Sequence, residues 1–150
     1  MRKAWTVLLT LALVALAGCN NSDKASNDVV GAGVTTTVHA DTTATCEPTG
    51  TSISIEALPN AKLAFDKNCL AVPAGKDITL TFDNEDNGVP HSVAILQSHT
   101  SAQIYFSTGQ TVGVKKQDFT IAANKLPGPG TYHFHCEVHP DQMNGTFIIK

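Results

Sequence analysis

The sequence predicts an all-β domain, an antiparallel β-sandwich, and three observations carry this prediction. From Cys46 onward, short β-rich runs are separated by Gly, Pro, Asn and Asp. About seven such runs occur within roughly 100 residues, which is the spacing of strands and turns in a small sandwich. No segment has the apolar period of a convincing amphipathic helix. At 150 residues, the chain has room for one ordinary domain.

Each predicted strand has its own apolar pattern. Residues 52–57 alternate, with Ile53 and Ile55 on one face, whereas residues 92–96 form a continuous apolar strand core. Residues 97–114 have no clear period, and both a short helix and a long loop remain open there. The other strands are predicted, in chain order, at 62–65, 77–82, 117–122, 130–136 and 146–149.

The N-terminal 18 residues are predicted to be a lipoprotein signal peptide. They begin with Arg2 and Lys3 and continue with an apolar run that is shorter than the roughly 20 residues of a membrane-spanning helix. The run ends in Leu-Ala-Gly-Cys19, which resembles the bacterial lipobox, where the signal is cut before a cysteine that is then acylated. We therefore expect an exported protein that is lipid-anchored through Cys19, on the periplasmic or extracellular side of a membrane.

Residues 19–45 are predicted to be a flexible, lipid-anchored tether, and residues 46–150 the folded domain. The tether consists largely of small and polar residues and has no aromatic residue, so it buries too little apolar surface to offset its ordering entropy. Removal of Arg2 and Lys3 with the signal leaves 8 basic residues against 13 acidic ones, a formal charge of −5. This mildly acidic balance argues against nucleic-acid binding, which needs a basic surface.

The four cysteines have three different predicted roles. Cys19 is the lipid site. Cys46 and Cys69 are a plausible disulfide pair, because disulfides persist outside the cytoplasm. Cys136 is surrounded by histidines, which indicates a metal site.

The strongest local motif places Cys136, His139 and Met143 at C-x2-H-x3-M spacing. A thiolate, an imidazole and a thioether in one short loop form a soft donor set that favours copper. Calcium and magnesium prefer carboxylates and carbonyls, and structural zinc sites usually use four strong ligands, commonly with paired cysteines. Zinc is therefore a weaker fit than copper.

A fourth donor is predicted upstream, at His91. This residue begins an apolar strand and follows Pro90, which restrains the backbone there. Together with the loop, His91 completes a set of two histidines and one cysteine with a weak axial methionine, the blue-copper pattern.

Three segments extend this pattern to a family resemblance: Ala-Val-Pro-Ala-Gly at 71–75, Pro-His-Ser-Val-Ala at 90–94 and Gly-Thr-Tyr-His-Phe-His-Cys at 130–136. With the closing motif, they resemble the plastocyanin/azurin family of type 1 blue copper proteins, the cupredoxins, over about residues 51–150. The resemblance implies a Greek-key antiparallel β-sandwich that binds one type 1 copper ion. It also implies that the ion is held by His91, Cys136, His139 and Met143.

The remaining histidines of the predicted domain are expected to take no part in this site. His133 and His135 are out of phase with Cys136 on an alternating strand, so we expect both to face away from the metal as surface residues. His99 is in the segment without a clear period, and we expect it to be solvated.

The predicted function is single-electron transfer between redox protein partners by a monomeric carrier, not enzymatic catalysis. The alternative is a copper chaperone or storage protein that delivers copper to a membrane oxidase, although such proteins usually carry exposed methionines or paired cysteines. A multicopper oxidase or nitrite reductase needs several further histidines. Glu137 stands where an oxidase's His-Cys-His motif would have its second histidine.

Overall fold

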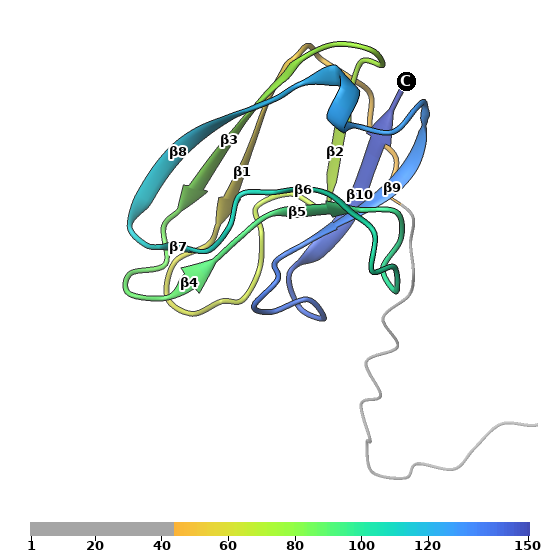
Figure 1. The fold of residues 1–150 in the computed structure, drawn as a ribbon. Coiled ribbons are helices and arrows are strands. Elements are labelled where there is room, and N and C mark those ends of the chain that lie inside the picture. The colour runs from red at the N-terminus through yellow and green to blue at the C-terminus, as the bar shows by residue number, and fades with distance from the viewer. Residues whose placement is uncertain (1–43) are drawn as a thin grey trace, which may run out of the picture. The chain divides into compact units, whose positions relative to one another are not determined.

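A computed structural model describes residues 44–150 of the chain, and this part contains no α-helix. Its elements (Figure 1) are β1 (Ser52–Ala57), β2 (Cys69–Val72), β3 (Ile78–Asn84), β4 (Pro90–His91), β5 (Ala94–Leu96), β6 (Ile104–Ser107), β7 (Thr111–Val112), β8 (Lys115–Ile121), the 3-10 turn η1 (Ala123–Lys125), β9 (Gly130–His135) and β10 (Asn144–Ile149).

Two main sheets form the sandwich. One has the strand order β1-β3-β8, the other β2-β10-β9-β5-β6, and the short strands β4 and β7 pair separately. The two main sheets share one apolar core, to which Leu80 and Phe82 contribute from the first sheet and Phe134 and Phe147 from the second. Neighbouring strands are often distant in sequence, as in the predicted Greek-key sandwich. The all-β fold class is confirmed.

Two strand pairs differ from the antiparallel expectation. β1 pairs with β3, and β2 with β10, in parallel, so both main sheets are mixed. Parallel neighbours need a long crossover connection. Here the chain leaves β1, contributes β2 to the opposite sheet and returns to β3, so β1 and β3 run in the same direction.

Some element predictions were also wrong. Residues 62–65 form no strand, because Ala61 and Leu63 have left-handed backbone conformations that break an extended run, and only Phe65 makes a bridge, to Ala57. The pattern missed β2, a four-residue strand. The segment 97–114 holds two short strands, β6 and β7, in place of the predicted helix or loop.

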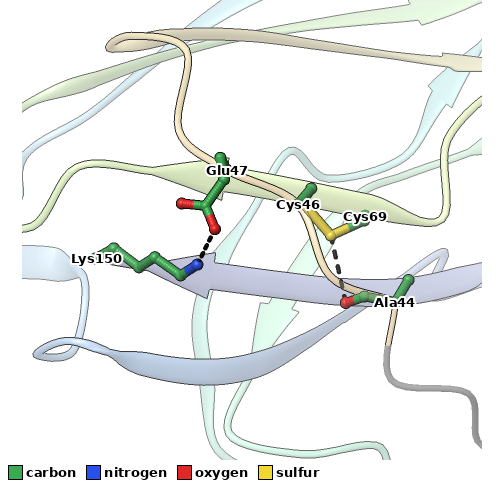
Figure 2. Close-up of a disulfide and its surroundings, with 5 residues drawn as sticks. All are labelled: Ala44, Cys46, Glu47, Cys69 and Lys150. Carbon is green, nitrogen blue, oxygen red and sulfur yellow. Dashed lines mark hydrogen bonds and ion pairs between the residues drawn. A yellow bond between two sulfur atoms is a disulfide. The ribbon is translucent and has the colours of Figure 1, made fainter.

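A disulfide joins Cys46 to Cys69, in agreement with the predicted pair (Figure 2). It ties the segment before β1 to the edge strand β2, and an ion pair between Glu47 and Lys150 lies beside it. Within residues 44–150, no helix has the length and hydropathy needed to cross a bilayer. The predicted signal peptide, Cys19 and nearly all of the predicted tether lie outside the described residues.

Candidate metal centre

The structure brings three predicted donors together at one end of the sandwich. His91 ends β4, Cys136 directly follows β9, and His139 lies in the loop between β9 and β10. The Sγ atom of Cys136 is 3.8 Å from His91 Nδ1 and 3.9 Å from His139 Nδ1, and the two Nδ1 atoms are 3.3 Å apart. These three atoms form a nearly equilateral triangle.

The loop that carries Cys136 and His139 is closed by its own backbone. The N–H of Cys136 donates to the carbonyl of Met143 at 2.8 Å, and the N–H of Met143 donates to the carbonyl of His139 at 3.0 Å. Because these bonds fold the loop back on itself, the C-x2-H-x3-M spacing becomes a tight turn. The side chain of Met143 is only 1% exposed and belongs to the same buried cluster as Cys136.

The family model for the cupredoxin-like domain matches residues 8–149. The chain belongs to the cupredoxin-like domain family. No curated protein sequence matches it.

Solved structures support the same fold for this cupredoxin. Reduced auracyanin from the photosynthetic bacterium Roseiflexus castenholzii is 25% identical, with a TM-score of 0.58 over 67% of this chain and 97% of that one. Auracyanin A, a "blue" copper protein from Chloroflexus aurantiacus, is 22% identical, with a TM-score of 0.56 over 67% and 99%. Reduced rusticyanin is 26% identical, with a TM-score of 0.53 over 69% and 83%.

Ser92, which follows His91, connects the upstream part of the cupredoxin's candidate centre to the loop that carries Cys136 and His139. Its backbone N–H points at the Sγ atom of Cys136 at 3.4 Å, and its Oγ accepts the N–H of Glu137 at 2.9 Å. Cys136 is fully buried, so this N–H is a hydrogen-bond donor to a sulfur that is shielded from solvent. Sequence reasoning missed this role, because the contact joins residues 44 positions apart.

Asp86 is a second functional residue that the sequence did not reveal. Its Oδ2 is 3.1 Å from Nε2 of His91, and the two side chains are 3% and 0% exposed. Its Oδ1 accepts the backbone N–H of Ala61 at 2.9 Å. The Ala61 N–H and the His91 hydrogen bond hold the pKa of the Asp86 carboxyl below its ordinary value, so the group is a carboxylate.

This carboxylate sets the tautomer of His91. A carboxylate only accepts hydrogen bonds, so Nε2 of His91 carries the proton and Nδ1 presents a lone pair to Cys136 and His139. A buried carboxylate behind a histidine is a common support for metal-binding imidazoles, because it fixes the orientation of the ring.

Asn84 fixes the segment that carries Asp86. Its buried Nδ2 donates to the carbonyls of Val89 and Thr111, and its Oδ1 accepts the backbone N–H of Asp86. Thr111 is in β7, so β3, the loop that follows it and β7 form one hydrogen-bonded unit around the upstream histidine.

His139 is held less firmly than His91. It is partly exposed, and no carboxylate within residues 44–150 is in hydrogen-bond contact with its ring. Burial, and to a lesser extent the neighbouring His91, lower the pKa of His139, and the more distant Asp86 opposes this. The neutral imidazole, which is the form that binds metals, is therefore favoured.

The donor set fits copper. The point equidistant from the three donor atoms lies about 2.1 Å from each, close to the length of a metal–imidazole bond. One thiolate and two imidazoles in a triangle, with a buried thioether in the same cluster, form the pattern of blue-copper sites.

The other histidines lie outside this triangle. On β9, Phe134 belongs to the core cluster between His133 and His135, and neither of these two residues is in the donor group. Both are partly buried, and His99 contacts the ring of His133, so these residues are not simple surface histidines. Burial lowers the pKa of His135, with a smaller contribution from His99, and Glu137 opposes the shift.

Proposed function

We propose that this cupredoxin binds one copper ion through His91, Cys136 and His139, with Met143 as a weak axial ligand, and carries single electrons between protein partners. The observation that carries the proposal is the triangle of Nδ1, Sγ and Nδ1 atoms, whose size and chemistry match a type 1 site. Auracyanin and rusticyanin, solved in reduced states, support a redox role for this chain as well.

Copper bound here would supply a one-electron couple between Cu(I) and Cu(II). The chain's own contribution is to keep the donors nearly still while the charge changes. The hydrogen bonds of Cys136 with Met143 and of His91 with Asp86 restrain both halves of the centre. Little reorganisation is then needed at each transfer.

Electrons are proposed to pass through the edge of His139. This imidazole is partly exposed, whereas His91 and Cys136 are fully buried. The buried donors also favour retention of the ion over its delivery to another protein, which supports a carrier over a copper chaperone.

We further propose that the protein works on the extracytoplasmic side of a membrane, anchored by lipid on Cys19. The lipobox-like Leu-Ala-Gly-Cys sequence and the Cys46–Cys69 disulfide support this location. Mass spectrometry of the native protein is expected to find residue 19 at the N-terminus and acylated. An unmodified Cys19 would contradict the anchor.

The electron-transfer proposal is tested by a redox titration of the copper-loaded protein. We expect one reversible electron per copper ion, followed by absorption or voltammetry. Copper that cannot be cycled, or that leaves the protein on reduction, would contradict the carrier role and favour delivery.

A further inference from the structure

A second histidine cluster lies apart from the candidate centre, on β9 and in the connection between β5 and β6. Nδ1 of His99 is 3.2 Å from Nε2 of His133, and the two rings are nearly perpendicular, with centroids 4.9 Å apart. The ring of His135 follows, 5.6 Å from that of His133. Three imidazoles are thus contiguous, outside the triangle formed by His91, Cys136 and His139.

The backbone fixes both members of the close pair. His133 lies on β9, opposite Leu96 of β5 and Thr146 of β10. His99 is in the connection 97–103, which is closed by a hydrogen bond from the N–H of Gln97 to the carbonyl of Gln103. A strand and a closed turn therefore present the two ring nitrogens to each other.

Without metal, this contact is a hydrogen bond between two imidazoles, one of which donates. A metal ion can take the place of the shared proton. Two nitrogens 3.2 Å apart and each about 2.05 Å from one ion subtend an angle of about 100°, near the tetrahedral value. The separation is therefore one at which two imidazoles can bind the same ion.

A second observation points to a ligand at this cluster. Nδ1 of His135 is buried and has no hydrogen-bond partner among residues 44–150, although buried polar atoms are nearly always paired. His135 is on the same face of β9 as His133, since both are immediate neighbours of the inward-facing Phe134 and side chains alternate along a strand. The ring beside the His99–His133 pair therefore has a nitrogen whose hydrogen-bonding capacity the described residues leave unused.

We propose that His99 and His133 form a second metal site, which takes a divalent late transition-metal ion on the outer face of the β5–β9 pair, next to His135. Imidazole nitrogens suit Cu(II), Zn(II) and Ni(II), with Cu(II) bound most tightly of these. The contact between His99 and His133 is solvent-exposed, so water can reach the other coordination positions of an ion held there. This makes an exchangeable site, unlike the buried centre.

Zn(II), titrated into the full chain and followed by calorimetry, tests the proposal. His99→Ala and His133→Ala are each expected to remove one equivalent, or to weaken it at least about 10-fold, since the loss of an outer-shell partner alone costs that much. Thr100→Ala, a change in the same exposed turn, is the matched control and is expected to keep the wild-type stoichiometry. Unchanged stoichiometry and affinity in both histidine variants would overturn the proposal.

Two further measurements separate this site from the buried centre. Cys136→Ser is expected to impair the buried centre and to leave the His99-dependent equivalent intact, so the two proposals can fail independently. In wild-type protein, NMR of the imidazole nitrogens is expected to show the resonances of His99 and His133 shifting together with Zn(II). Zinc binding that shifts neither ring would also overturn the proposal.

Discussion

The segment 84–92 and the loop 136–143 each carry part of the candidate metal centre, but different contacts hold them in place. His91 is fully buried and is supported by Asp86 of the same segment, and Asp86 is in turn held from outside the segment by the N–H of Ala61. The loop is closed by hydrogen bonds between its own residues, and His139 stays partly exposed. The upstream segment is thus fixed by contacts across the fold, and the loop by hydrogen bonds between residues that are close in sequence.

In the proposed electron carrier, the two regions would therefore contribute different features to the site. The segment 84–92 supplies a firmly held ligand, His91, with the negative charge of Asp86 behind its ring. The local loop supplies the thiolate and an imidazole edge close to solvent. Substitutions in the two regions are therefore expected to have different effects.

The largest expected effect is that of a substitution at Gly145, in β10 just after the loop 136–143. A Cβ atom at this position would lie 2.4 Å from the carbonyl oxygen of Asn68 and 2.5 Å from the ring of Phe134. Gly145→Ala is therefore expected to lower the free energy of unfolding by about 1–3 kcal/mol, as overpacking usually does. Gly128→Ala, where the added atom meets open space, is the control. Equal denaturant midpoints for the two variants would show that Asn68 and Phe134 move aside at little cost.

Asp86 is the matching test of the upstream half. Asp86→Asn removes the negative charge and can satisfy only one of the two N–H groups, from His91 and Ala61, that the carboxylate accepts. We expect Cu(II) affinity to fall about 10–100-fold and the reduction potential to rise. Asp83→Asn, which removes a partly exposed ion pair with Lys116, is expected to change neither. Similar copper affinities for wild type and Asp86→Asn, by competition titration, would contradict the role of the carboxylate.

The sequence revealed the loop and missed much of the upstream half for a physical reason. Cys136, His139 and Met143 are close in the chain, so their spacing alone identifies the motif. Asp86 is close to His91 in the chain, but the hydrogen bond that positions it comes from Ala61, 25 residues away, and the role of Ser92 depends on a contact across 44 residues. Such pairings exist only once the strands are assembled.

The same argument explains the errors in the fold. The sandwich was predictable because alternation and turn residues are local signals. The parallel pairing of β1 with β3 depends on which sheet receives β2, and no local pattern records that choice. Strands of four and two residues, such as β6 and β7, are too short to display a period.

Met143 tests how the loop tunes the centre. A weak thioether donor mainly adjusts the balance between Cu(I) and Cu(II). Met143→Gln, a stronger donor, is expected to lower the reduction potential, and Met143→Leu to raise it, with copper bound in both. Voltammetry measures both changes. Wild-type potentials in both variants would show that Met143 serves only as core packing.

The smallest expected effect is a pH dependence of the metal-free protein. Burial lowers the pKa of His135 and His139 below their ordinary value of 6.5. The unfolded chain therefore binds protons first as the pH falls, and the free energy of unfolding should decrease below about pH 6.5. Urea unfolding at about pH 7.5 and about pH 5.5 measures this decrease, which His135→Gln should reduce. Equal stability at the two pH values would contradict it.

The visible absorption spectrum of the copper-loaded, oxidised protein tests the central claim most directly. If His91, Cys136 and His139 hold the ion in a triangle, the protein should be intensely blue through thiolate-to-copper charge transfer. Cys136→Ser should then be colourless, because it lacks the thiolate. A colourless wild-type protein that nevertheless binds copper, or a blue Cys136→Ser variant, would contradict the proposed centre.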